Sequence, residues 1–458
     1  MAENLPAAFL AQMERLLGED GLKRYLASLD APVTRALRVN LLRCADGVPP
    51  CDIEGLGAPV PWAKGAYFIE GDARPGLSAL HEGGLYYLQE PSALSSASVL
   101  APEPGQKVLD LCAAPGGKST QLAALMQGEG LIVCNEPIPS RAQILSRNIE
   151  RMGVKNAVVT CVYPDQLAPR FPAFFDRIMV DAPCSGEGMF RRQIEARDEW
   201  QENSPRGCAD RQMEILEQAA AMLAPGGRMV YSTCTFNDTE NEGVLARFLA
   251  LHEEFSLVPF ALDALPAADK GYLHLYPHEI RGEGHFVSLL EKSADAPGAP
   301  ADSAAKRPAR GKQRPQQRSG REKTPSLPAL PDVFAPGAAP GRLHAAGDFL
   351  WSLPEGIEPG RLEGLRVLRT GLLIAHAEGR RYEPDHALAM AMRPQDAARC
   401  AELTPEQALS YQAGEVLSLG EDLPAGYTLL CCCGVPLGWG KQAGGVMKNH
   451  YPKGLRRR

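Results

Sequence analysis

The chain lacks several patterns that would place it in a specialised class of protein. It has no run of about eighteen apolar residues, so we expect no membrane-spanning helix. Its first residues, Met1 to Pro6, lack the basic and apolar regions of a secretory signal, so we expect a cytoplasmic protein. No two of its 12 cysteines form a CxxC pair, which disfavours a zinc knuckle and predicts reduced thiols. We also find no internal repeats.

An overall excess of positive charge is also missing. The formal net charge is -7, so any contact with nucleic acid must use local basic patches. Residues 293–326 form such a patch, with eight basic against three acidic residues and almost no large apolar side chain. This composition predicts a disordered linker. The linker is either a solvated tether or a basic arm that grips phosphates.

The remaining composition is that of a globular protein, with 45% apolar and 22% charged residues in 458, enough for several domains. Helical apolar spacing followed by short strand-like pieces predicts a small α+β domain over residues 1–85. Strand and helix patterns then alternate, which predicts a doubly wound α/β core over residues 86–292. Beyond the linker, short strand-like segments predict a β-rich region over residues 327–458.

The stretch from Phe175 to Gly188 carries the strongest signal for a functional site. An apolar, strand-like run ends at Asp181, Pro183 prevents further pairing, and Cys184 follows at once. Cys234 follows the next predicted strand. Ligands of open α/β sheets bind beyond the carboxyl ends of the strands, so both thiols can face one pocket. They are either nucleophiles with a lowered pKa or buried, inert residues.

The loop after the first strand of the core predicts a cofactor cradle. Its glycines allow close backbone approach, and a helix N-terminus follows. A Walker A loop would need glycine at position 112, and no GxGxxG fingerprint is present. An adenosyl ligand without a bound phosphate therefore fits better, with a purely structural turn as the alternative. Glu136, which ends the second strand, can accept hydrogen bonds from both ribose hydroxyls. The loop consists of Cys112, Ala113, Ala114, Pro115, Gly116, Gly117 and Lys118.

Three motifs in this order resemble those of the Sun-type RNA cytosine-C5 methyltransferases: Cys112–Lys118, Asp181–Gly186 and Ser232–Thr235. The motif Gly282–Phe286 and two C-terminal motifs, Leu437–Lys441 and Lys448–Gly454, resemble the RsmF (YebU) branch of that family. That branch methylates small-subunit ribosomal RNA and carries a PUA-like region. The resemblance implies a class I, Rossmann-like methyltransferase core, S-adenosylmethionine as cofactor and RNA as partner. It implies a monomer without a metal ion.

The resemblance also implies roles for individual residues. Cys234 would attack C6 of the cytosine, and Cys184 would assist proton removal from C5 and release of the product. Asp181 would hold the base, and Lys118 would orient Asp181. Cofactor contacts are implied for the loop at 112–118, Glu136, Asp181 and Arg141.

One position departs from the family pattern. The residue that usually holds the adenine, shortly after the third strand, is missing, which leaves Asp165 or Tyr163 for this role. There are three alternative functions. A tRNA cytosine-C5 methyltransferase and a non-catalytic RNA-binding assembly factor stay open. A DNA cytosine methyltransferase is disfavoured by the second cysteine.

Overall fold

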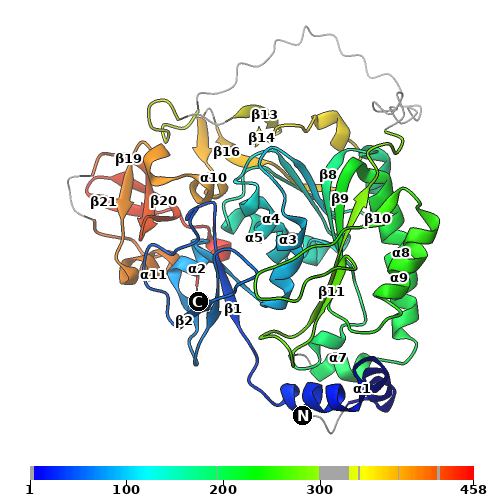
Figure 1. Ribbon diagram of the computed structural model, residues 1–458. Coiled ribbons are helices and arrows are strands. Elements are labelled where there is room, and N and C mark those ends of the chain that lie inside the picture. The colour runs from blue at the N-terminus through cyan, green and yellow to red at the C-terminus, as the bar shows by residue number, and fades with distance from the viewer. Residues whose placement is uncertain are drawn as a thin grey trace.

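The computed structural model describes residues 5–192, 194–298, 330–338, 341–379, 381–419 and 423–457 (Figure 1). The predicted basic linker at 293–326 lies outside these residues from position 299 onward. In the part of the chain that the structure describes, no helix is long and apolar enough to cross a membrane. The same residues contain no group of three His, Cys, Asp or Glu side chains that could hold a metal ion.

Within the described residues, a nine-stranded sheet forms the centre of the molecule, in the order β10-β12-β9-β8-β5-β6-β7-β15 with β11 paired to β12. The strands β9, β8, β5, β6 and β7 run parallel, which confirms the predicted α/β core. The bounds are β5 (Lys107–Asp110), β6 (Leu131–Asn135), β7 (Ala157–Thr160), β8 (Phe175–Asp181), β9 (Leu223–Thr233), β10 (Phe255–Leu257), β11 (Tyr272–Leu275), β12 (His285–Lys292) and β15 (Val367–Thr370).

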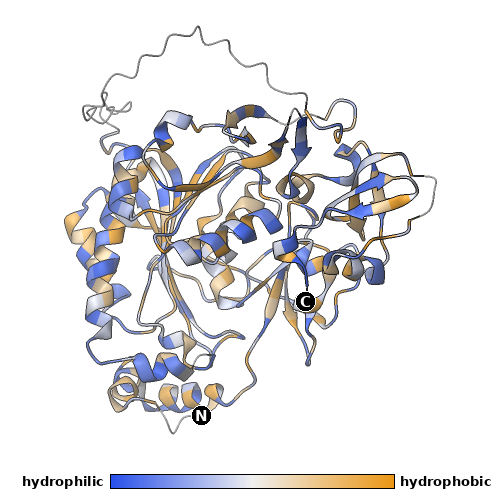
Figure 2. Ribbon diagram, turned by 180° about the vertical axis from the view of Figure 1, so that it is seen from behind, coloured by the Kyte–Doolittle hydropathy of each residue, from blue (hydrophilic) through white to orange (hydrophobic). Residues whose placement is uncertain are grey.

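Helices cover both faces of this sheet. One apolar cluster joins the strands to α3 (Ser95–Leu100), α4 (Gly117–Leu125) and α5 (Pro139–Arg151). A second cluster, on the other face, joins them to α6 (Pro164–Leu167), α8 (Ser204–Met222) and α9 (Glu242–Leu251). Figure 2 shows the helices with one polar and one apolar side, whereas the central strands are mostly apolar. This is the pattern of a sheet buried on both faces.

The N-terminal region consists of a long helix and a separate antiparallel sheet. The helix α1 (Ala7–Leu29) breaks at Gly18, where the backbone has φ 71° and ψ 173°. It packs on Phe190, Trp200 and Phe236, which lie beyond the carboxyl ends of β8 and β9. The sheet has the order β2-β3-β1-β4, with β1 (Ala36–Val39), β2 (Leu56–Pro59), β3 (Ala66–Ile69) and β4 (Tyr86–Gln89). The short helices η2 (Pro75–Leu77), α2 (Ala79–Glu82) and η3 (Ser92–Leu94) complete this region.

The C-terminal region forms two further four-stranded sheets, in the orders β13-β14-β16-β17 and β18-β19-β20-β21. This confirms the predicted β-rich character. Their bounds are β13 (Arg342–Ala346), β14 (Phe349–Leu353), β16 (Leu372–Glu378), β17 (Arg381–Pro384), β18 (Cys400–Glu402), β19 (Gly426–Cys432), β20 (Val435–Ala443) and β21 (Val446–Asn449). The helices are α10 (His386–Ala391) and α11 (Pro405–Ala413). One strand of this region, β15, pairs with β7 and so extends the central sheet.

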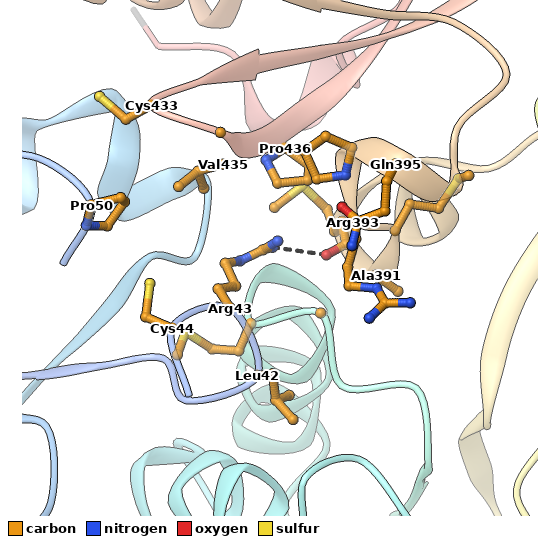
Figure 3. Close-up of a pocket in the computed structure, with 16 residues that line it drawn as sticks. Leu42, Arg43, Cys44, Pro50, Ala391, Arg393, Gln395, Cys433, Val435 and Pro436 are labelled. Carbon is orange, nitrogen blue, oxygen red and sulfur yellow. Dashed lines mark hydrogen bonds between the residues drawn. The ribbon is translucent and has the colours of Figure 1, made fainter. Parts of the chain in front are cut away.

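The three regions meet at a pocket of about 360 Å³ (Figure 3). Arg43, from the N-terminal region, donates a hydrogen bond of 2.8 Å from Nη2 to the carbonyl oxygen of Met390. Met152 and Gly153 line the pocket from the end of α5, and Val435 lines it from β20. None of the predicted site residues lines this pocket. It is therefore a junction between regions and lies apart from the site at the strand ends.

Candidate active site

The two predicted thiols meet at the carboxyl edge of the central sheet. Because β8 and β9 are parallel neighbours with Asp181 opposite Ser232, the residues that follow them emerge side by side. The sulfur atoms of Cys184 and Cys234 lie 3.3 Å apart, and both residues are partly buried. The hydrogen bond to Cys234, followed by burial, raises the pKa of Cys184 well above its ordinary value. Cys184 is therefore a protonated thiol at neutral pH.

Asp181 is the centre of a polar network beside the thiols. Lys118 donates from Nζ to Asp181 Oδ2 at 2.8 Å, and Ser232 donates from Oγ to Oδ1 at 2.9 Å. Burial opposes ionisation of Asp181, but the charge of Lys118 and the hydrogen bonds from Lys118 and Ser232 together outweigh it and lower the pKa of this carboxyl. Burial likewise opposes the charge of Lys118, yet the carboxylate of Asp181 raises the pKa of Lys118. Asp181 remains ionised with 32% of its side chain exposed, so a ligand can reach it.

His285 also faces this network, although it was not among the predicted site residues. Its Nε2 lies 3.0 Å from Ser96 Oγ and 3.6 Å from Asp181 Oδ1. Burial lowers the pKa of His285 to about 3, helped by the nearby positive charge of Lys118. The ring is therefore neutral at pH 7. It contributes a hydrogen-bonding group to the wall of the site and no charge.

Two buried carboxylates, which were not predicted from the sequence, hold together the loops after β8 and β9. These loops carry Cys184 and Cys234 and are called the thiol loops below. Glu187 Oε2 accepts the backbone N–H groups of Phe236 at 2.8 Å and Asn237 at 3.0 Å. Glu240 Oε2 accepts the N–H of Ser185 at 3.1 Å, and its Oε1 accepts from Asn237 Nδ2 at 2.7 Å. Each glutamate thus bridges the loop after β8 and the loop after β9. Burial raises the pKa of Glu240.

The predicted cofactor loop follows β5 and leads directly into α4. Gly116 precedes the helix with φ 111°, a left-handed conformation that favours glycine. A Cβ atom there would lie 3.2 Å from Leu145 Cδ1, so a side chain would press against Leu145 in a backbone conformation that is strained for any residue but glycine. Neighbouring side chains fix the loop by donating hydrogen bonds to its carbonyl oxygens. Arg141 Nη2 donates to that of Ala114 at 3.2 Å, and Asn148 Nδ2 donates to that of Pro115 at 2.9 Å.

Two carboxylates beside this loop fit an adenosyl ligand. Glu136, at the end of β6, is 2% exposed; its Oε1 accepts the N–H of Ile138 at 3.0 Å and its Oε2 lies 3.5 Å from Arg141 Nη1. Asp110, at the end of β5, accepts from Ser119 Oγ at 2.6 Å through Oδ2. Its Oδ1 is buried without a hydrogen-bond partner among the described residues, and burial raises its pKa to about 7. A buried oxygen without a partner next to a glycine cradle is what a polar ligand group would satisfy.

The structure does not bring the proposed adenine-contacting residues into this network. Tyr163 is 65% exposed, and Asp165 is exposed in the first turn of α6. Neither side chain of these two residues donates to or accepts from another predicted site residue. Cys112 is partly buried, and burial raises its pKa well above the ordinary value, so it is a neutral thiol in the loop. Cys431 and Cys432, from the C-terminal cysteine run, are buried in β19.

Comparisons with known families agree with this geometry. Residues 97–291 match the family described as 16S rRNA methyltransferase RsmB/F. The flanking regions match three descriptions specific to RsmF: its N-terminal domain at 5–91, its first C-terminal domain at 330–392 and its PUA domain at 398–457.

Curated relatives cover nearly the whole chain. Ribosomal RNA small subunit methyltransferase F of Erwinia tasmaniensis is 33% identical over 477 residues, 98% of this chain and 96% of the relative. The protein of the same name from Shigella boydii serotype 18 is 33% identical over 484 residues, with the same coverage of 98% and 96%.

Solved structures share the fold of the core. A methyltransferase homologue from Pyrococcus horikoshii is 30% identical, with a TM-score of 0.54 over 62% of this chain and 94% of its own. NSun6 from the same organism is 22% identical, with a TM-score of 0.55 over 64% of this chain and 99% of its own, and supports the fold alone.

The Rossmann-like core, the glycine cradle and the thiol pair thus define an S-adenosylmethionine-dependent RNA methyltransferase. Within that class, the chain belongs to the RsmF family of 16S rRNA methyltransferases.

Proposed function

We propose that this protein methylates C5 of a cytosine in small-subunit ribosomal RNA through a covalent enzyme–RNA adduct. The observation that carries the proposal is the contact of 3.3 Å between Cys184 and Cys234 beside the Lys118–Asp181 pair. C5 of cytosine is a poor nucleophile until a thiolate adds at C6. A pair of thiols next to a carboxylate suits that chemistry, because one sulfur can attack while the other handles the proton.

The bound cofactor supplies an electrophilic methyl group, and the chain's own residues do the rest. Cys234 attacks C6 as a thiolate. The ionised Asp181 accepts a hydrogen bond from the exocyclic amine of the base and orients it. Once C5 carries the methyl group, Cys184 passes its own thiol proton to solvent and, as a thiolate base, removes the C5 proton. The electron pair of that C–H bond restores the ring double bond and expels Cys234 from C6.

The cofactor is held by the loop at 112–118 and by the carboxylates around it. Glu136 accepts the ribose hydroxyls, and Arg141 holds both Glu136 and the loop backbone. Asp110 adds a polar contact through its unpaired oxygen. We keep Asp165 as a candidate for the adenine amine, because it follows β7 at the same edge of the sheet. The target base has to leave its stack to reach this site. We propose that the regions at 1–85 and 327–458 bind the surrounding RNA.

Bisulfite sequencing of small-subunit ribosomal RNA tests this function. The pattern of protected cytosines is compared between RNA from cells with the gene and RNA from cells without it. In a second experiment, purified protein and radiolabelled S-adenosylmethionine are added to the RNA from cells without the gene. We expect one or more cytosines protected only when the gene is present, and label incorporated at the same positions. Unchanged protection together with no incorporation would contradict the proposal.

A further inference from the structure

A groove of about 560 Å³ lies between the N-terminal sheet and the loop that carries Cys184. Three arginines line it: Arg35 precedes β1, Arg74 precedes η2, and Arg192 follows the Cys184 loop. Leu77, Leu88 and Gln89 form much of the remaining wall. The groove therefore joins segments that are distant in sequence but share one side of the molecule.

The positive charge of these arginines is largely uncompensated. The side chain of Arg74 is exposed and has no hydrogen bond or ion pair with any residue that the structure describes. Among the described residues, the guanidinium group of Arg35 donates to the backbone carbonyl oxygens of Gly71 and Ala73. Arg192 donates to the carbonyl oxygen of Thr34 at 2.6 Å and lies 3.4 Å from Glu283, a carboxylate that also pairs with the buried Arg191. An anionic ligand would thus meet the free guanidinium group of Arg74 and two further cations whose charge is only partly balanced.

Acidic side chains near the groove face elsewhere. Glu90 lines it, but its carboxylate accepts the backbone N–H groups of Ser92, Ala93 and Glu283. Asp52, Glu54 and Asp72 line a separate hollow that shares only the ridge of Arg74, Pro75 and Leu77 with the groove. The carboxylates of Asp52, Glu54 and Asp72 therefore lie on the hollow side of the ridge, Arg35 and Arg192 lie on the groove side, and Arg74 stands on the ridge itself.

The groove also offers exposed apolar surface and reaches the cofactor loop. Leu77 is 65% exposed and Leu88 is 37% exposed, so each presents apolar surface to solvent. Arg457, at the C-terminus, donates to the carbonyl oxygens of Leu77 and Ser78 and adds a cation at the rim. At the other end, Gln89 lies against Gly117, where a Cβ atom would be 3.4 Å from Gln89 Cδ. Guanidinium groups beside apolar side chains suit a chain that alternates phosphates and bases.

We propose that this groove binds the single-stranded RNA segment next to the target cytosine. Arg74 and Arg192 contact its phosphates, and Leu77 and Leu88 pack on the face of an unstacked base. The inference rests on the proposed function, since it places the strand that leads into the thiol site. It adds a specific subsite, which holds the RNA in register while the target base is turned toward Cys234.

The full-length variant Arg74→Glu tests the subsite. Initial rates are measured on small-subunit ribosomal RNA from cells that lack the gene, over a range of RNA concentrations. We expect the KM for RNA to rise about tenfold while kcat stays within about twofold, because the charge contacts substrate away from the reacting atoms. The matched control is Lys155→Glu, which makes the same charge change at an exposed, unpaired cation beside the amino end of β7 and should leave KM unchanged.

Binding measurements separate failure of the subsite from failure of the proposed function. For the same RNA, Arg74→Glu should lower the slope of log affinity against log salt by about one, and Leu77→Asp should weaken binding while S-adenosylmethionine affinity is unchanged. If the wild type methylates the RNA and Arg74→Glu matches Lys155→Glu in KM and salt slope, the subsite is refuted. If the wild type methylates no RNA but Arg74→Glu alone binds more weakly, the subsite stands and the proposed function fails.

Discussion

The sulfur atoms of Cys184 and Cys234 are so close that distance alone does not decide which one attacks the base. Their surroundings differ, however. The pKa of Cys184 is raised by its hydrogen bond to Cys234 and by burial, which makes it a poor thiolate but a strong base once deprotonated. Because the raised pKa makes Cys184 the poorer source of a thiolate, we favour Cys234 as the nucleophile.

The variant Cys184→Ala should trap the covalent adduct. It keeps the attacking sulfur but loses the group that removes the C5 proton, so the protein cannot release the RNA. A denaturing gel of protein expressed in cells, with and without ribonuclease, should show a slow, ribonuclease-sensitive band. Cys234→Ala and the double variant serve as controls and should show none. A band in Cys234→Ala alone would reverse the two roles.

The cofactor site should be sensitive at Gly116 and Glu136. Valine at position 116 would place its Cβ against Leu145 at a φ of 111°, so the loop has to move. Glu136→Ala removes the hydrogen bonds that we propose to the ribose, which would be worth about 1–3 kcal/mol, or about 5- to 150-fold in affinity. Calorimetric titration with S-adenosylmethionine measures both effects. Wild-type affinity in both variants would place the cofactor elsewhere.

Two buried groups of the site should change the pH dependence of stability in opposite directions. The pKa of His285 falls from an ordinary 6.5 to about 3 on folding, so the unfolded chain binds the extra proton and stability is lost as pH drops below 6.5. The pKa of Asp110 rises from 3.8 to about 7, so its contribution is present at low pH and lost as pH rises through 7.

We therefore expect His285→Gln and Asp110→Asn to differ in sign. When the pH falls from 7 to 5.5, the low pKa of His285 costs the wild type about 1 kcal/mol of stability, and His285→Gln should abolish this loss. Over the same range, the raised pKa of Asp110 adds stability of similar size, and Asp110→Asn should abolish this gain. Thermal unfolding of each variant and of the wild type at the two pH values measures the change. Parallel pH profiles for all three proteins would show that neither group has a shifted pKa. His285 and Asp110 both became visible only in three dimensions, because their roles depend on burial beside Asp181 and the loop.

At the scale of elements, the strand–loop pattern of the core was predictable because each signal is local. The apolar run from Phe175 to Asp181 coincides with β8. The sequence pattern predicts helices at residues 119–126 and 141–152, each within two residues of the ends of α4 and α5. The same pattern ends a helix at Pro225 and its two glycines and begins the next strand at Arg228. This start is wrong, because β9 begins at Leu223 and includes Pro225 at a register shift opposite Phe175 and Arg177. A bulge of this kind depends on the partner strand.

The clamp formed by Glu240 should couple the two thiol loops. Glu240→Ala leaves the N–H of Ser185 without its acceptor and removes one acceptor each from the amides of Asn237 and Gln212, which loosens the position of Cys184. We expect kcat to fall at least about tenfold with S-adenosylmethionine affinity unchanged. Glu242→Ala is the matched control, since Glu242 pairs with His274 at 2.7 Å and touches neither thiol loop. Equal activity in both variants would argue against the clamp.

At the scale of the whole molecule, the way the C-terminal region packs on the rest was not predictable. Composition predicted a β-rich region but not its contacts with the core. In the structure, β15 pairs with β7, and the backbone N–H of Cys161 donates to the carbonyl oxygen of Arg366 at 2.8 Å. One apolar core combines Leu37 and Leu85 of the N-terminal region with Leu430 and Leu437 of the C-terminal region. Such contacts join positions hundreds of residues apart, and periodicity within a segment carries no information about them.

Removal of residues 327–458 should consequently destabilise the entire protein. It would expose the edge of β7, open the shared apolar core and leave the guanidinium of Arg43 without the carbonyl of Met390. We expect a lower Tm or aggregation of the truncated chain, measured by thermal unfolding against full-length protein. An unchanged Tm would show that the C-terminal region is energetically independent.

The RNA-binding role of the C-terminal region is therefore better tested in the full chain. Residues 448–457, called the basic tail here, include the exposed side chains of Lys448 and Lys453. These two lysines form no ion pair among the residues that the structure describes. Replacing both by glutamate should leave Tm and S-adenosylmethionine affinity unchanged but weaken RNA binding and lower its salt dependence, because each lysine that contacts a phosphate releases a counterion. Filter binding at several salt concentrations measures this. If affinity and salt slope stayed at wild-type values, the tail would have no part in RNA binding, and the groove beside Arg74 would be the main phosphate contact outside the thiol site.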